Sequence, residues 1–316
     1  MSTEIANWAP IGVFIYKRPE HARRTIVSLL ASDGVRLSPI HVFADGPRTD
    51  ADALAVTATR AVAHELLGDG ATYVERDRNL GLANSIIAGT TALCDRYGAS
   101  IVVEDDLIVA PYFLRFLNEG LERYRDEPHV MQISGYMFDV PALERTRQAL
   151  LLPLTTSWGW ATWKRAWELF DPEATGWRER LAREGEESRF NLDGNYDYSR
   201  MLQQQMDGAL DSWAIRWWYT VFARRGLTLF PPVTLVVNRG LDASGTHDRL
   251  ARPARQAELG SATSFDLPTA VVESEKTPQV FEAIRMFRRS SAFGRLRALG
   301  AIPARRLQSL RGNRTQ

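Results

Sequence analysis

In the segment Ile101-Val102-Val103-Glu104-Asp105-Asp106, three branched apolar residues lead directly into three carboxylates, and this is the clearest indication of the fold class. A short, uninterrupted apolar run of this kind is typical of a strand buried on both faces of a parallel sheet. In an open α/β sheet the ligand crevice lies at the carboxyl ends of the strands, where these acids would stand. Adjacent ionised carboxylates repel one another, and a divalent cation with a preference for oxygen would offset that repulsion. The alternative is a polar loop start with solvated acids.

The segments around this stretch alternate between short β-rich runs and amphipathic helical patterns. Upstream, the pattern predicts strands at 11–16, 41–44 and 72–74 and helices at 20–30, 51–67 and 82–97. Downstream, Pro111 suits the first turn of a helix that reaches Tyr124, and 130–134 returns as a strand. This alternation predicts an α/β fold with an open, twisted, mostly parallel sheet flanked by helices, as in Rossmann-like proteins.

The second half of the chain is rich in tryptophan, and its apolar pattern is mostly helical. Helices are expected at 160–170, 196–209 and 212–225, packed beside the sheet as a separate subregion. Strands are expected at 228–230 and 233–237, on either side of the Pro231-Pro232 break. A polar, glycine-bearing loop follows at 238–248.

Composition excludes several classes of protein. The 316 residues carry 39 basic and 38 acidic side chains, so the net charge of +1 gives no electrostatic reason to expect a nucleic-acid partner. A single cysteine, Cys94, excludes internal disulfides and Cys-rich zinc sites. The chain shows no signal-peptide pattern and no run of eighteen apolar residues, which predicts a cytoplasmic protein without a membrane span.

Polar residues also follow the other predicted strands. Arg18 precedes Pro19 and a helix, so its side chain and the N–H groups of the helix start could bind an anionic phosphate or nucleotide. The alternative is that Lys17 and Arg18 are a solvated pair at the end of the strand. Asp45 and Asn79 would face a nucleoside in the same crevice, or act only as turn and capping residues. Neither a P-loop nor a Gly-x-Gly-x-x-Gly motif is present, which argues against an NTPase or a dehydrogenase.

Four segments together resemble the N-acetylglucosaminyltransferase I family, nucleotide-sugar transferases of the GT-A fold. The segments are Val13-Phe14-Ile15-Tyr16-Lys17-Arg18-Pro19, Asn79-Leu80-Gly81-Leu82-Ala83, Val102-Val103-Glu104-Asp105-Asp106-Leu107 and Pro111-Tyr112-Phe113. The resemblance covers about residues 11–247. It implies donor-binding roles for Arg18, Asp45 and Asn79 at the uridine, Glu104 at the sugar and Asp105 at the ribose, with Asp106 holding Mn²⁺ or Mg²⁺.

The resemblance also implies a domain organisation and an activity. A GT-A catalytic domain would span 1–248, with a nucleotide-binding half at about 10–135 and an acceptor half at about 136–248, followed by a C-terminal extension at 249–316. The expected reaction is an inverting transfer of a sugar from a UDP-sugar, with UDP-GlcNAc as one candidate, to a glycan, lipid-linked or small-molecule acceptor. One alternative is a sugar nucleotidyltransferase, but such an enzyme needs a glycine-rich loop for the triphosphate, and this sequence has none near its start. The other is a non-catalytic protein that binds a carbohydrate or a nucleotide sugar.

The transfer also needs a base for the acceptor hydroxyl. Asp211 is the candidate, because it precedes a helix, stands among aromatic residues and resembles the family's Asp-x-Trp motif. The alternative is that Asp211 caps that helix, and the two roles can coexist. Asp207, one helical turn earlier, is the second candidate for the base. Trp158 and Trp160 could form a wall of the sugar pocket or belong to the core. His247 could ligate the metal or stand in a surface turn.

The end of the chain is strongly basic. Nine arginines and no acid occur from Arg285 onward, interleaved with apolar residues from Phe287 to Ile302. Such a basic amphipathic tail is expected to contact an anionic membrane surface, here the inner face of the membrane, unless it is simply solvated or disordered.

Overall fold

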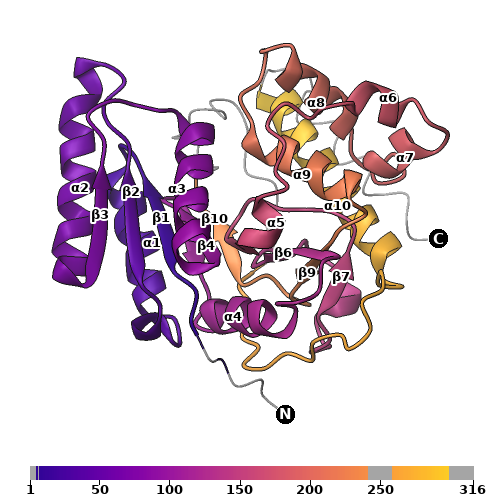
Figure 1. The fold of residues 1–316 in the computed structure, drawn as a ribbon, viewed down its shortest axis with the longest axis horizontal. Helices are drawn as coiled ribbons and strands as arrows, with labels where there is room; N and C mark the ends of the chain where they lie inside the picture. Colours follow the sequence, from indigo (N-terminus) through magenta and orange to yellow (C-terminus); the bar gives the residue numbers. More distant parts are fainter. Residues whose placement is uncertain (1–4, 6, 241–257, 299–316) are drawn as a thin grey trace.

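The computed structural model describes residues 5, 7–240 and 258–298, and its strands form two sheets (Figure 1). The strands are β1 (Ile11–Ile15), β2 (Ile40–Ala44), β3 (Ala71–Glu75), β4 (Ala99–Glu104), β5 (Leu107–Val109), β6 (Val130–Ser134), β7 (Leu150–Leu152), β8 (Trp160–Trp163), β9 (Leu227–Phe230) and β10 (Val236–Asn238). The main sheet has eight strands in the order β3-β2-β1-β4-β8-β6-β9-β7, and β10 pairs with β5 in a small second sheet.

Helices cover both faces of the main sheet. They are α1 (Pro19–Leu30), α2 (Ala53–Leu67), α3 (Leu82–Tyr97), α4 (Phe113–Arg123), α5 (Lys164–Trp167), α6 (Trp177–Leu181), α7 (Glu186–Phe190), α8 (Tyr198–Met206), α9 (Trp213–Ala223) and α10 (Thr277–Ala298). In Figure 1, α1 and α2 lie at one end of the molecule, and α6 to α8 lie at the other end as the helical subregion.

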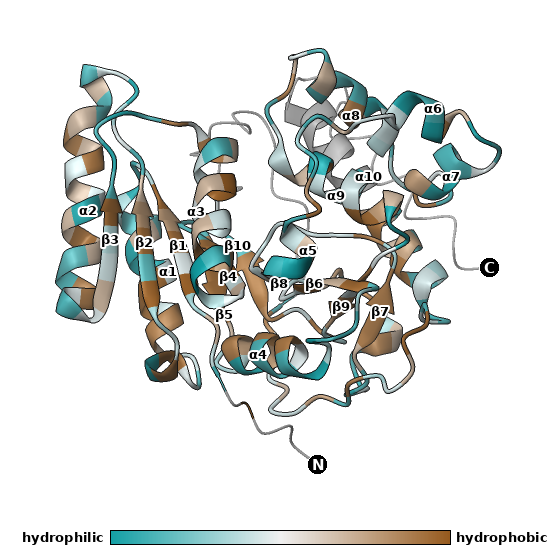
Figure 2. Cartoon of the chain, viewed as in Figure 1, coloured by the Kyte–Doolittle hydropathy of each residue, from teal (hydrophilic) through white to brown (hydrophobic). Residues whose placement is uncertain are grey.

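The first half of the sheet forms as the sequence predicts. Strands β3, β2, β1 and β4 pair in parallel, with β1 between β2 and β4. Successive residues of β1 face opposite sides: Val13 and Ile15 join the core cluster with α1 and α4, whereas Phe14 joins the cluster with α3 and α9. Figure 2 shows β1, β2 and β4 as largely hydrophobic and the flanking helices as a mixture of hydrophobic and hydrophilic residues. The prediction of an open α/β sheet with helices on both faces is confirmed.

The predicted helix at 160–170 is wrong at its start. Residues Trp160–Trp163 form strand β8, which pairs antiparallel with both β4 and β6, and the helix begins only at Lys164. Tryptophans at 160, 163 and 167 have helical spacing, which produced the error. All four residues of β8 are buried, because the strand lies inside the sheet with helices over both faces.

Helix α10 belongs to the body of the protein. Val280, Phe281 and Ile284, in its first two turns, are buried in the cluster that contains α3 and α9. The described part of the predicted extension is therefore packed onto the rest of the chain, and residues 299–316 of the basic tail lie outside the described residues. No helix in the described parts of the chain is both long and apolar enough to cross a membrane.

Candidate functional site

The three acids stand where β4 leaves the sheet, and neighbouring elements fix two of them. The Asp105 carboxylate accepts a 3.3 Å hydrogen bond from the Tyr16 backbone N–H, just beyond β1. Its backbone carbonyl accepts a 2.8 Å bond from the Thr25 hydroxyl of α1. The Asp106 carbonyl accepts a 2.7 Å bond from the Arg239 N–H, just beyond β10. The turn after β4 is thus held between β1, α1 and the end of β10.

Arg18 is the cation of this site. It directly precedes Pro19, the first residue of α1, which places it at the carboxyl end of β1. Its Nη2 atom donates to Asp105 Oδ1 at 2.7 Å and to Asp106 Oδ2 at 2.8 Å. Its Nη1 atom is buried and has no hydrogen-bond partner among the described residues. One guanidinium therefore faces three carboxylates and retains a donor that a bound anion could use.

The excess of negative charge changes the acidity of the cluster. Burial, together with the charges of Asp106 and Asp105, raises the pKa of Glu104 to about 8. Burial also raises the pKa of Asp105 to about 6, although Arg18 opposes the shift. A divalent cation at this position would favour the ionised carboxylates and so lower both values.

This acidity gives stability a specific pH dependence. The pKa of Glu104 rises from its usual 4.5 to about 8 in the folded protein, so the folded state binds this proton more tightly than the unfolded chain. Its contribution to stability is complete below about pH 4.5 and is lost as the pH rises through about 8. We expect the unfolding temperature without divalent cations to fall across this range, and Glu104→Gln to flatten the fall. An equal slope in wild type and variant, measured by calorimetry, would refute this assignment.

Asp45 and Asn79 shape one loop at the same edge of the sheet. The Asp45 carboxylate, which follows β2, accepts hydrogen bonds from the backbone N–H groups of Leu80 at 3.0 Å and Gly81 at 3.2 Å. The Asn79 amide donates to the Gly46 carbonyl at 3.1 Å. Both side chains thus have the loop contacts of the alternative interpretation, although no side chain caps α3, which begins after Gly81. Their contact with a uridine stays a prediction.

Asp211 lies against this loop. A Cβ built on Gly81 would lie 3.9 Å from Asp211 Oδ2, which brings the residue beside the loop that Asp45 holds. The Asp211 side chain is 65% exposed, and its nearest cation is Arg216 Nη2 at 3.8 Å. The predicted alternative role as helix cap is not observed, because the Ser212 hydroxyl caps α9 by accepting from the Ile215 N–H. The Asp211 carboxylate is therefore open to solvent beside this loop.

The two candidate tryptophans differ. Trp160 is 0% exposed and stacks on Trp213 with ring centroids 5.0 Å apart, so the prediction that it forms a pocket wall is wrong and it belongs to the core. Trp158 is only partly buried and meets the Tyr136 ring edge-to-face at 4.6 Å, with Phe287 of α10 at 6.4 Å. Trp158 remains a candidate for a sugar contact. His247 lies outside the described residues.

The end of β10 and the residues after it also belong to the site, and no motif in the sequence pointed to them. Asn238 Nδ2 lies 3.5 Å from Asp106 Oδ1. A Cβ at Gly240 would lie 2.2 Å from Asp106 Oδ2 and 2.9 Å from Arg18 Nη1, so a larger residue would have to displace this ion pair. The glycine-bearing loop was visible in the sequence, but its position against the acids depends on the pairing of β10 with β5.

The residues at the end of β4 fit a divalent cation for which the protein supplies only some of the ligands. Mg²⁺ usually binds through one or two carboxylates, with substrate phosphates and water completing its octahedron, and Mn²⁺ shares the preference for oxygen. Asp106 offers such a carboxylate at the crevice. Within the described residues, no group of three or more acidic, histidine or cysteine side chains is arranged to hold a metal. A cation at Asp106 would thus depend on a bound ligand for its remaining contacts.

Gly240→Ala tests this close approach. The added methyl group would push the Asp106 carboxylate from its pairing with Arg18, and loss of a contact that orients a metal ligand typically costs about 10- to 100-fold in metal affinity. We expect that loss in Mn²⁺ affinity, measured by electron paramagnetic resonance in the presence of nucleotide. The control is Gly70→Ala, because a Cβ there meets no atom within 4 Å. Unchanged Mn²⁺ affinity in Gly240→Ala would count against the contact.

Comparisons with known proteins found similar solved structures, but no similar sequences. Neither a protein-family model nor a curated protein matches the chain. A solved structure described as the crystal structure of GalNAc-T7 with UDP, GalNAc and Mn²⁺ is similar at 11% sequence identity, with a TM-score of 0.46. The match covers 74% of this chain and 44% of that one, so this chain spans less than half of its neighbour's length.

Proposed function

We propose that the chain is a metal-dependent glycosyltransferase, which moves a hexosyl or N-acetylhexosaminyl group from a UDP-sugar to an acceptor hydroxyl by inverting displacement. The observation that carries the proposal is the convergence of Arg18, Asp105 and Asp106 at the carboxyl end of β4, with Asp211 beside the adjoining loop. The motif resemblance supports the donor class. UDP-GlcNAc is the first donor to test.

The departing nucleoside diphosphate needs compensating positive charge. A divalent cation at Asp106, when bound, would supply Lewis-acid stabilisation of the diphosphate. Arg18 would bind the donor through Nη1, the buried donor atom without a partner, while Nη2 keeps Asp105 and Asp106 in place. Asp105 would accept from the ribose and Glu104 from the sugar, at the edge where β4 ends.

The incoming hydroxyl needs a base on the opposite side of the anomeric carbon. Asp211 is suited to accept that proton, because its carboxylate is exposed and is not used to cap α9. Arg216, 3.8 Å away, would orient the carboxylate. Proton removal and departure of the diphosphate on opposite sides would invert the configuration of the sugar.

The acceptor is the least defined part of the proposal. A glycan, a lipid-linked saccharide and a small molecule all remain candidates, because selectivity depends on pocket shape. A cytoplasmic enzyme whose basic tail touches an anionic membrane would favour the lipid-linked class. Two arginines in the described part of that tail also have contacts within the protein. Arg285 donates a 3.0 Å hydrogen bond to Glu282, and Arg288 lies over the Tyr196 ring at 4.8 Å.

A donor screen tests the function. The full chain is incubated with UDP-, GDP- and dTDP-sugars, with Mn²⁺ or with chelator, and unfolding temperature and release of nucleoside diphosphate are measured. We expect a UDP-sugar to stabilise the protein and to be slowly hydrolysed, in both cases only with the metal. Binding without hydrolysis or transfer would favour the non-catalytic binder. Release of pyrophosphate from UTP and a sugar phosphate would favour the nucleotidyltransferase.

A further inference from the structure

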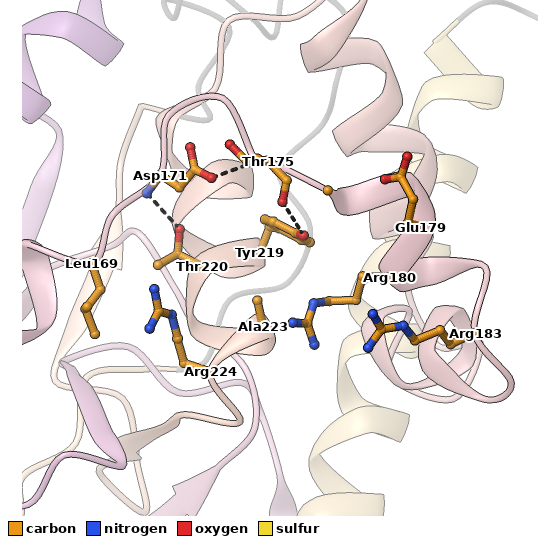
Figure 3. Close-up of a pocket in the computed structure, with 11 residues that line it drawn as sticks. Leu169, Asp171, Thr175, Glu179, Arg180, Arg183, Tyr219, Thr220, Ala223 and Arg224 are labelled. Atoms are coloured by element: carbon orange, nitrogen blue, oxygen red, sulfur yellow. Dashed lines mark hydrogen bonds between the residues drawn. The ribbon is translucent and has the colours of Figure 1, made fainter.

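The helical subregion contains an open cavity of about 580 Å³, formed between α6, the end of α9 and the segment 169–176 (Figure 3). None of the acids at the end of β4 and none of the predicted donor residues lines it. Its volume lies within the range of pockets that bind organic ligands, and it is too large for a bare inorganic ion alone.

Three arginines line this cavity: Arg180, Arg183 and Arg224. Figure 3 shows the Arg180 and Arg183 side chains extending toward Ala223, with Arg224 on the other side of Ala223. Within the described part of the chain, neither Arg183 nor Arg224 forms an ion pair through its side chain. Arg180 reaches only 4.0 Å from Glu186 Oε2, and Glu186 is already bound by Arg225 at 2.6 Å. The Arg183 and Arg224 side chains are exposed, so their donors are open to a ligand.

The two acids of the cavity offset this charge only in part, because three arginines line it with two carboxylates. The Asp171 carboxylate accepts hydrogen bonds from the backbone N–H groups of Thr175 at 2.7 Å and Glu173 at 3.0 Å, so its oxygens serve the local turn. Glu179 is the only other carboxylate of the lining. It is exposed, and it could accept a bond from a ligand hydroxyl.

We infer that the cavity binds the carboxylate or phosphate group of an acidic carbohydrate, as a second acceptor subsite. Arginine presents a planar fork of donors that matches either oxyanion, and the cavity has room for the sugar that carries it. This inference rests on the proposed function, in which Asp211 is the base that the acceptor must reach. Asp211 precedes the start of α9, whereas the cavity lies near its end. The 11 residues of α9 span about 17 Å. An acceptor that reaches both ends must therefore be an oligosaccharide.

Direct binding tests the subsite without any donor or transfer reaction. Glucuronate, glucose 1-phosphate and neutral glucose are titrated into the full chain by calorimetry at constant ionic strength. We expect at least one anionic sugar to bind where glucose does not, and Arg183→Gln and Arg224→Gln each to weaken it about tenfold or more. Preference for glucuronate assigns a carboxylate, and preference for glucose 1-phosphate assigns a phosphate.

Arg178→Gln is the matched control. It removes one positive charge from α6, five residues before Arg183, but Arg178 stacks over the Trp177 ring at 4.6 Å and is not part of the cavity lining. Equal weakening by Arg178→Gln, or no binding of either anionic sugar above glucose, would overturn the subsite. Because the measurement omits donor and metal, it can succeed even when the donor screen shows no transfer. The two failures are therefore distinguishable.

Discussion

Asp106→Asn is expected to lower the rate of sugar transfer by about a thousandfold or more. Stabilisation of a departing phosphate by a metal is worth several kcal/mol, and each 1.36 kcal/mol corresponds to about a tenfold change in rate. The asparagine keeps the shape of Asp106 but removes the charge that would hold the cation. It also removes one of the two carboxylates that pair with Arg18 Nη2. Both the rate and the Mn²⁺ affinity in the presence of UDP should fall.

The control for this change is Asp69→Asn, which makes the same substitution in an exposed turn before β3. It should leave the rate and the Mn²⁺ affinity at wild-type values. If Asp106→Asn kept wild-type turnover, or if a chelator left wild-type turnover intact, the metal-dependent mechanism would have to be abandoned. A fall in turnover with unchanged Mn²⁺ affinity would move the cation to another residue.

Asp211→Asn is expected to lower transfer by roughly 100- to 10,000-fold, the usual contribution of a general base. The donor and Mn²⁺ should still bind with wild-type affinity, because Asp211 lies beside Gly81 and not among the carboxylates after β4. Transfer is measured with saturating donor, and donor binding is measured separately by calorimetry. Retained affinity with lost transfer separates this role from that of Asp106.

Asp207→Asn is the matched control for the base. Asp207 ends α8, only four residues before Asp211, and its carboxylate accepts a 2.6 Å hydrogen bond from the Gln203 amide. The substitution should have little effect on transfer. Near-wild-type transfer in Asp211→Asn would refute the role of Asp211 as the base. A larger loss in Asp207→Asn would assign that role to Asp207.

The parts of this fold that could be predicted from the sequence depend on local pattern. Apolar runs at 11–15 and 101–103 and helical spacing at 82–97 are visible in single segments, and each formed as expected. The gathering of Arg18, Asp105 and Asp106 could also be predicted, because the order of parallel strands brings their carboxyl ends together.

The features that could not be predicted depend on pairing between distant segments. Strand β8 was hidden because tryptophans at helical spacing can also fill a strand that is buried on both faces. The position of Gly240 beside Asp106 follows from the pairing of β10 with β5, more than a hundred residues away in sequence. Likewise, Trp160 carries no local sign that distinguishes a core tryptophan from a ligand-facing one.

Strand β8 runs antiparallel to β4, and this determines which segments meet at the end of the sheet where β4 leaves it. Because Trp160 pairs with Val102, the chain enters β8 at the end of the sheet where β4 leaves it. Trp158 and Gly159, which precede β8, therefore stand level with the last residues of β4. This edge of the main sheet therefore combines the ends of parallel strands with the start of an antiparallel one, and so the tryptophan-rich half of the chain reaches the acids after β4 without a long connecting loop.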